Sequence, residues 1–235
     1  MSQPVDIQHK KRRVFFYVDG FNLYYRMLQK KPELKWLCLK TLAQKFMFPR
    51  DNVEKIKFFT AKVDPQFTTS SKQKRQINYW DALKSTGVDI IEGVMEQKIR
   101  ACELPNSHEC PKRATFFAWA EKMTDVNLAL HVYRDFMDEK PDVICVISAD
   151  MDIMPALKMV RDTKIPVLIY TYLPSQDEDL LRSRLPQNYQ VAMTRRLSES
   201  HITQSQFPDK VEIAPSEWRE RPSSWAPKMS AWPRA

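Results

Sequence analysis

Aspartates directly follow two apolar segments of the chain. Asp19 comes after the segment Val14–Val18, and Asp150 and Asp152 come shortly after the segment Val143–Ile147. Short continuous apolar runs rich in β-branched and aromatic residues are typical of strands buried in a parallel sheet. Carboxyl ends of parallel strands lie at one edge of a sheet, and side chains two residues apart face the same way. The sequence therefore predicts that these carboxylates meet in one crevice.

Clustered carboxylates predict a site for a divalent cation. Asp125, near the start of a predicted helix, could complete the cluster. Several carboxylates a few ångströms apart do not all stay ionised unless a cation neutralises them, and their oxygen atoms suit Mg²⁺ or Mn²⁺. No histidine lies beside these turns, so we expect metal-assisted attack of water on a phosphodiester. The competing interpretation is that such aspartates, with Asn22 and Ser148, are ordinary helix caps and turn formers.

The remaining segments predict alternating strands and helices. Right-handed βαβ units follow from this alternation and place all strand ends at one edge. The predicted fold is a layered α/β domain with a mainly parallel sheet. Thr124 is the expected N-cap of one helix. We expect helices at residues 22–29, 39–48, 70–85, 124–138 and 154–161, and further strands at 53–62, 88–92 and 167–170.

Two segments break this alternation. Residues 94–118, which hold Cys102, His108 and Cys110, predict an inserted hairpin or loop. After about residue 198 the pattern is lost and prolines recur, which indicates an extended arm or linker. Tryptophans recur there every seven residues, and they either pack back on the domain, which we favour, or dock on a protein partner or nucleic acid. They are Trp218, Trp225 and Trp232.

Composition favours a negatively charged partner. The chain has 37 basic and 29 acidic residues, a formal net charge of +8. Nucleic acid is the leading candidate. No apolar run of about 18 residues is present, so we expect no membrane association and a cytoplasmic location. The four cysteines are too scattered for a disulfide framework and are expected to be reduced.

Basic and aromatic side chains could form a groove for nucleic acid beside the acids. Trp119 or Phe117 could stack on a base, although such residues are usually part of a core or a solvated helix face. The basic candidates are Lys72, Lys74, Arg75, Lys112, Arg113, Arg195 and Arg196.

Three motifs in order resemble the NYN domain family, a branch of the PIN-like nuclease superfamily. Residues 17–24, Tyr-Val-Asp-Gly-Phe-Asn-Leu-Tyr, resemble its opening motif, and residues 121–128 and 146–152 resemble its second and third acidic motifs. The resemblance spans about Arg13 to Arg196. It implies a PIN-like (Rossmannoid) three-layer α/β/α domain over 13–198, a basic extension over 1–12 and an arm over 199–235.

The resemblance also implies a role for each motif residue. Asp19, Asp125, Asp150 and Asp152 would bind Mg²⁺ or Mn²⁺ and carry the catalysis. Asn22 would orient a ligand or phosphate, Ser148 and Thr124 would support the carboxylates, and Lys122 would contact phosphate. Met151 and Ile153 depart from the residue types that the family often has there, which would alter the pocket wall. Relatives often carry paired cysteines before the second motif, but no CxxC pair is present here.

The resulting expectation is a metal-dependent endoribonuclease, with RNA preferred over DNA only by resemblance to the superfamily. One alternative is an NYN-fold module that binds RNA or recruits a subunit with little or no catalysis. A haloacid-dehalogenase-like phosphatase is a weaker alternative, because Asp150-Met151-Asp152 imitates its nucleophile and acid pair but Asp19 and Asp125 would have no role. A homo-oligomer or a protein partner of the arm is also possible.

Overall fold

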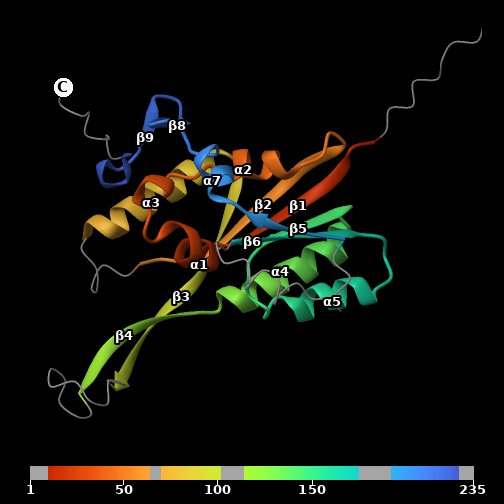
Figure 1. Ribbon diagram of the computed structural model, residues 1–235, viewed down its shortest axis with the longest axis horizontal. Coiled ribbons are helices and arrows are strands. Elements are labelled where there is room, and N and C mark those ends of the chain that lie inside the picture. Colours follow the sequence, from red (N-terminus) through yellow and green to blue (C-terminus); the bar gives the residue numbers. More distant parts are fainter. Residues whose placement is uncertain (1–9, 64–69, 102–113, 175–191, 228–235) are drawn as a thin grey trace, which may run out of the picture.

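A seven-stranded, mostly parallel sheet forms the centre of the molecule (Figure 1). The computed structural model describes residues 10–63, 70–101, 114–174 and 192–227. Strand order is β4-β3-β2-β1-β5-β6-β7, and only β4 runs antiparallel to its neighbour. The strands are β1 (Arg12–Asp19), β2 (Asp51–Ala61), β3 (Val88–Ala101), β4 (Thr115–Lys122), β5 (Val143–Ile147), β6 (Leu168–Pro174) and β7 (Met193–Leu197).

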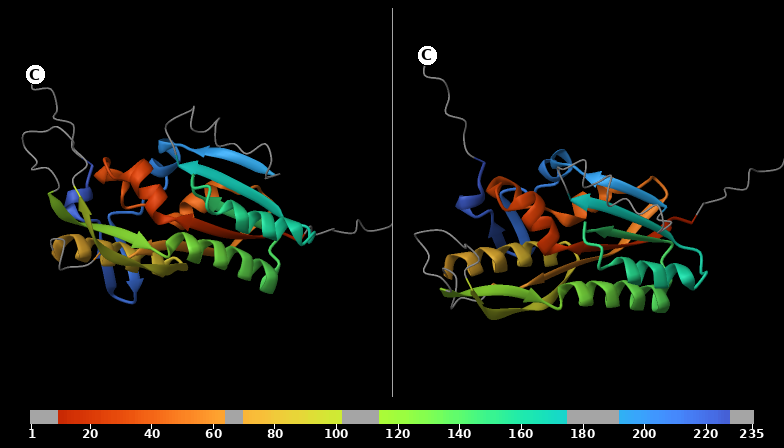
Figure 2. Two further views of the ribbon diagram at one scale, coloured as in Figure 1. Left: turned by 90° about the horizontal axis from the view of Figure 1, so that it is seen from below. Right: turned by 60° about the horizontal axis from the view of Figure 1, so that its bottom comes forward.

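Helices cover both faces of the sheet, which confirms the predicted three-layer α/β/α arrangement (Figure 2). Side chains of β1 alternate between the two faces. Phe16 and Val18 belong to one core with the helical segments that precede β3, whereas Phe15 and Tyr17 belong to a second core with the two helices that follow β4. The first face carries α1 (Gly20–Leu23), the π-helical η1 (Tyr24–Leu28), η2 (Pro32–Leu34), α2 (Leu39–Phe46) and α3 (Ser70–Ser85), and the second carries α4 (Thr124–Glu139) and α5 (Met154–Asp162).

Most predicted elements are confirmed, with shifted ends. The helix expected at 22–29 begins at Gly20, because the Asp19 side chain accepts a hydrogen bond from the Asn22 amide and so caps α1. The strand expected at 88–92 continues to Ala101. The prediction of Thr124 as an N-cap is wrong. Met123 occupies that position in a left-handed conformation with φ of 77°, and its side chain makes no capping hydrogen bond.

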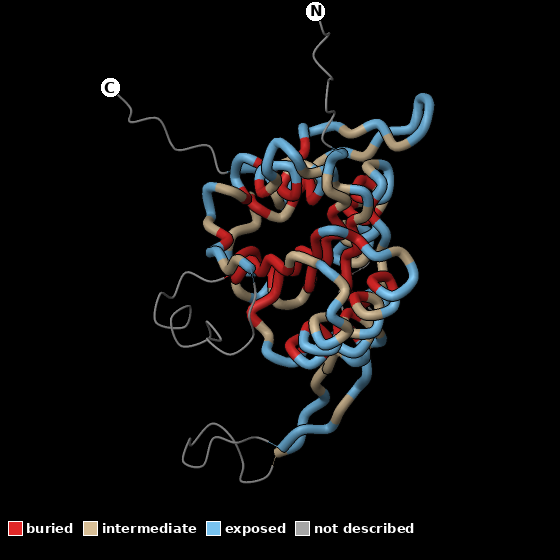
Figure 3. Tube along the Cα trace, turned by 90° about the vertical axis from the view of Figure 1, so that its right-hand side faces the viewer, coloured by how far each residue is buried: buried red, intermediate tan, exposed pale blue. Residues whose placement is uncertain are grey.

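The insertion expected at 94–118 is a hairpin in its described part. The second half of β3 pairs antiparallel with β4 from Val94↔Lys122 to Ala101↔Thr115. These paired strands project beyond the layered core, and their ends are mainly exposed (Figure 3). Cys102, His108 and Cys110, which without a CxxC pair are not expected to bind zinc, lie outside the described residues.

The segment after residue 198 is folded as far as residue 227, in contrast to the expected extended arm. Phe207 is buried against Trp36, and the indole Nε1 of Trp36 donates to the Pro208 carbonyl at 2.8 Å. Trp225 packs on Trp36 and Tyr79, as favoured for one of the three tail tryptophans. Trp218 is 52% exposed, and Trp232 lies outside the described residues. The elements are α7 (Glu199–Thr203), the hairpin β8 (Lys210–Ala214) and β9 (Glu217–Glu220), and η3 (Ser223–Trp225).

The tail is folded and not extended because its aromatic rings are buried against the domain. Apolar side chains spaced along a proline-containing segment can be buried in this way without a regular hydrophobic period.

Among the described residues, no helix has the length and apolar character needed to cross a membrane.

Candidate metal centre

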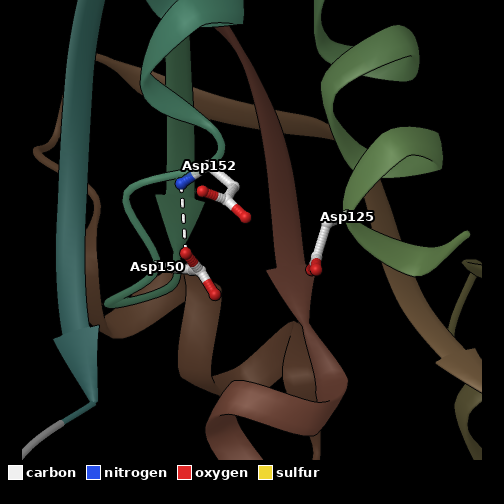
Figure 4. Close-up of side chains that lie close together, drawn as sticks. All are labelled: Asp125, Asp150 and Asp152. Carbon is white, nitrogen blue, oxygen red and sulfur yellow. Dashed lines mark hydrogen bonds between the residues drawn. The ribbon is translucent and has the colours of Figure 1, made fainter. Parts of the chain in front are cut away.

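Three carboxylates converge at the edge of the sheet where β1 and β5 end. Asp125, Asp150 and Asp152 each offer an oxygen atom, and these atoms lie within 4.8 Å of one another. Figure 4 shows them facing the space between the first turn of α4 and the loop after β5. We call these three residues the acidic cluster. Two of its members come from the loop between β5 and α5, as the parallel-sheet argument predicted.

Asp19 lies beside the acidic cluster and is fixed by hydrogen bonds. The register pairs Val18 with Ile147, so Asp19 and Ser148 leave their strands as neighbours. The Ser148 hydroxyl donates to Asp19 Oδ2 at 2.8 Å and accepts from the Asp150 amide at 3.0 Å. Both oxygen atoms of Asp19 are thus engaged, since Oδ1 accepts from the Asn22 amide at 2.9 Å.

Asn22 connects α1 to the loop after β5. Its Oδ1 accepts a hydrogen bond from the Ala149 amide at 3.0 Å. Within that loop, the Asp152 amide donates to Asp150 Oδ1 at 3.0 Å. The side chains of Asp19, Asn22 and Ser148 therefore hold the loop backbone after β5 and so position the carboxylates of Asp150 and Asp152.

Glu121 orients the start of α4, which carries Asp125. Glu121 Oε1 accepts a hydrogen bond from the Thr124 amide at 2.7 Å. Glu121 belongs to the second acidic motif, but the resemblance assigned it no role of its own. Thr124 is buried, and its hydroxyl has no hydrogen-bond partner among the described residues. A Cβ atom added at Gly93 would lie 2.5 Å from that hydroxyl oxygen, so β3 packs tightly here.

Burial and neighbouring negative charges raise the pKa of two carboxyl groups in this site, those of Asp125 and Asp19. Burial, followed by the charges of Asp19, Asp150, Glu121 and Asp152, raises the pKa of Asp125 to about 6. Burial also raises the pKa of Asp19, while its hydrogen bonds from Asn22 and Ser148 act in the opposite direction. The charged forms therefore repel one another, and a cation would relieve this repulsion.

Other predicted site residues lie around the cluster in different settings. Lys122 is exposed at the end of β4 and lies beside Lys98, whose pKa it lowers. Lys72 and Arg75 lie on α3 and line a cavity with Trp119. Arg195 stacks over Phe48, with 5.8 Å between its guanidinium carbon and the ring centre. Phe117 is 67% exposed on β4, Lys74 is exposed on α3 and Arg196 is exposed on β7, whereas Lys112 and Arg113 lie outside the described residues.

The chain matches a family model and is similar to individual proteins, among them the two that follow. The NYN domain model matches residues 13–187. The 6-hydroxy-3-succinoylpyridine 3-monooxygenase of Pseudomonas putida is 31% identical over 199 residues, which cover 73% of this chain and 63% of that protein. A protein of unknown function from Vibrio parahaemolyticus has 12% identity and a TM-score of 0.44, covering 85% of this chain and 98% of its own.

Proposed function

Because this chain belongs to the NYN domain family, we propose that it is a metal-dependent endoribonuclease that hydrolyses phosphodiester bonds in RNA. The observation that carries the proposal is the acidic cluster, whose three oxygen atoms lie within 4.8 Å of one another. Carboxylates without a neighbouring histidine suit a hard cation. The choice of RNA rests on the resemblance to the PIN-like superfamily.

Asp125, Asp150 and Asp152 would hold Mg²⁺ or Mn²⁺, and Asp19 would support them from beside the cluster. The bound ion would supply a Lewis acid that neutralises phosphate charge and lowers the pKa of water. Asn22 and Ser148 hold the loop that presents two of the carboxylates. Thr124 and Glu121 fix the first turn of α4, and with it the position of Asp125.

Cleavage assays with and without metal test this proposal. Purified protein is incubated with labelled single-stranded RNA, structured RNA and single-stranded DNA, each with Mg²⁺, Mn²⁺ or EDTA. We expect cleavage of RNA with either ion and none in EDTA. Cleavage that persists in EDTA would exclude the metal mechanism. Binding of RNA without cleavage in either ion would favour the RNA-binding or recruitment module.

The haloacid-dehalogenase-like phosphatase remains an alternative that a second substrate distinguishes. Asp19→Asn and Asp150→Asn are compared on a phosphomonoester. Turnover that survives the first change and is lost with the second would favour the phosphatase, because Asp19 has no role in that mechanism.

The match to the Pseudomonas putida protein favours a second candidate, oxidation of a hydroxylated pyridine. Monooxygenation consumes O₂ and a reductant, so this candidate is tested by oxygen uptake with NADH and 6-hydroxy-3-succinoylpyridine. The three glycines, at 20, 87 and 93, are too dispersed for a glycine-rich dinucleotide loop, which favours the nuclease. Oxygen uptake that requires both compounds would replace the nuclease proposal.

A further inference from the structure

An aromatic cavity of about 420 Å³ opens between α1–η1, α3, the β3–β4 hairpin and η3. This volume lies within the range typical of small-ligand pockets, about 300–1,000 Å³. We call this pocket the aromatic cavity. Its apolar lining is dominated by aromatic rings, among them Phe21, Tyr24, Tyr25, Tyr79, Trp119 and Trp225.

The aromatic cavity lies at the same edge of the sheet as the acidic cluster. Gly20 and Phe21 line it and directly follow Asp19, which is hydrogen-bonded to Ser148. The end of β2, at Thr60 and Ala61, lines it too. A ligand in this cavity would therefore contact residues that directly follow Asp19, the carboxylate beside the acidic cluster.

The wall beside Asp19 is fixed by close packing. A Cβ atom added at Gly20 would lie 2.6 Å from the Phe59 carbonyl oxygen and 2.7 Å from the Phe58 ring, so α1 is pressed against β2. On the opposite side, the Gln76 side chain donates to the Ala61 carbonyl at 2.9 Å and accepts from the Val63 amide at 2.8 Å. The cavity is thus formed by elements that are tied to the sheet.

Three cationic side chains line the aromatic cavity, and the charge of Glu33 acts on one of them, Lys35, without forming an ion pair among the described residues. They are Lys35, Lys72 and Arg75, and the described lining residues include no aspartate or glutamate. In the part of the chain that the structure describes, none of the three forms an ion pair. Lys35 Nζ lies 5.1 Å from the centre of the Tyr24 ring. Burial, followed by the nearby positive charge of Arg75, lowers the pKa of Lys35, and Lys72 adds to this effect.

This combination of rings and cations suits a planar ring that is attached to an anionic group. Single-stranded nucleic acid offers both, because its bases are free to stack on aromatic side chains and its phosphates attract lysine and arginine. A paired base in a duplex is already stacked and is not free to enter. We propose that the aromatic cavity takes one base of a single-stranded RNA, while Lys35, Lys72 and Arg75 contact the adjoining phosphates. This inference rests on the proposed function and names the form of RNA that the acidic cluster would cut.

Binding measured in EDTA tests this inference without cleavage. The probe is a labelled single-stranded RNA of about eight nucleotides, compared with an abasic chain of the same length. We expect wild type to bind the abasic chain about tenfold more weakly, because stacking of one base contributes roughly 1–3 kcal/mol. Tyr25→Ala, at a 59% exposed ring, should remove most of this difference.

The cations are tested with a matched control on the same helix. Lys72→Gln combined with Arg75→Gln should weaken binding of both chains about tenfold, because two phosphate contacts are lost. Lys84→Gln, at an exposed position on α3 that does not line the cavity, should change affinity less than about twofold. Melting temperatures of all variants verify that they are folded.

Three outcomes would overturn the inference: equal affinity of wild type for base-containing and abasic chains, equal loss with Lys84→Gln, or displacement of the RNA by benzoate as effectively as by unlabelled RNA. The last would identify a small-molecule site for aromatic acids. Failure of the nuclease proposal is recognised separately, by absence of cleavage of the same RNA with Mn²⁺. Base-dependent binding without cleavage would support the role of the aromatic cavity and contradict the nuclease proposal. Cleavage without base-dependent binding would support the nuclease proposal and contradict the role of the cavity.

Discussion

Asp150 shows the dual function of an aspartate in this site. Its carboxylate accepts a hydrogen bond from the Asp152 amide and so shapes the turn, and it also raises the pKa of Asp125 by its charge. The interpretation as a turn former and the interpretation as a ligand are therefore compatible. What distinguishes the two is the presence of other carboxylates within a few ångströms, which no single residue in a sequence reveals.

Asp150→Asn should abolish metal-dependent RNA cleavage and raise the melting temperature of the metal-free protein. Asparagine keeps the shape and the turn hydrogen bond but removes one repelling charge. For a chain of this size, each kcal/mol of relieved repulsion raises the melting temperature by about 2–4 °C. Calorimetry with EDTA and a cleavage assay with Mn²⁺ provide the two measurements.

Asp138→Asn provides the matched control for this substitution, because Asp138 is an exposed residue of α4 outside the acidic cluster. Asp138→Asn should leave the melting temperature in EDTA and the rate of RNA cleavage with Mn²⁺ unchanged. Near-normal cleavage by Asp150→Asn together with Asp19→Asn would remove the proposed site.

Gly93→Ala should lower cleavage although it alters no carboxylate. The added methyl group would lie 2.5 Å from the Thr124 hydroxyl oxygen, 2.7 Å from the Lys122 carbonyl oxygen and 3.0 Å from Glu121 Oε1. The start of α4 must then shift, and Asp125 moves with it. We expect a decrease in kcat of about tenfold or more, since small misplacement of a catalytic group is costly. A variant with unchanged kcat and an unchanged melting temperature would contradict this account of α4.

At the scale of elements, strands buried on both faces were the best predicted. β1 and β5 contain continuous apolar runs rich in β-branched and aromatic residues, which are typical of central parallel strands. β4 was predicted only as part of a hairpin or loop over residues 94–118, because its exposed residues include Phe116 and Phe117 and so follow no alternation of polar and apolar side chains. β7 was missed for a related reason, since Arg195 and Arg196 are exposed in its centre.

Convergence of the aspartates from the loops was predictable because chain direction in a parallel sheet determines where strands end. The contribution of Glu121 was not, because it depends on the left-handed conformation of Met123. The aromatic cavity was also beyond sequence reasoning. Its walls come from segments as distant as Phe21 and Trp225.

The tail elements should contribute to stability through Trp225. Its ring lies 6.4 Å from that of Trp36 and 6.0 Å from that of Tyr79, measured between ring centres. Trp225→Ala should lower the free energy of unfolding by about 2 kcal/mol, less than for a fully buried tryptophan. Trp218→Ala, at a 52% exposed ring, should change it little. Equal effects of the two changes in urea unfolding would show that the packing of the tail on the core is not stabilising.

At the scale of the whole molecule, a partly buried polar network between α4 and β2 links stability to pH. His131 Nδ1 lies 3.2 Å from Lys57 Nζ and 3.1 Å from Arg134 Nη2, so it must act as an acceptor and the ring is neutral. Burial, followed by the positive charges of Lys57 and Arg134, lowers the pKa of His131. Lys57 also forms a buried ion pair with Asp135.

The contribution of His131 to stability should therefore fall as the pH is lowered through about 6.5, the ordinary pKa of histidine in an unfolded chain. Below that pH the unfolded chain binds a proton that the folded protein does not yet bind, and this difference favours unfolding. His131→Gln keeps an acceptor but cannot titrate, so its melting temperature should fall less than that of wild type between about pH 7.5 and pH 5.5. Parallel curves for the two proteins would exclude His131 as a contributor.

The acidic cluster takes one carboxylate from α4 and two from the loop after β5, so any cation that binds there connects two segments that are otherwise separate in the chain. Local opening of either segment would then require release of the ion, which raises the free energy of that opening. Backbone amides in the first turn of α4 and in residues 148–153 should consequently exchange with deuterium more slowly in Mn²⁺ than in EDTA. Occupancy of the site can thus be followed in the absence of any nucleic acid.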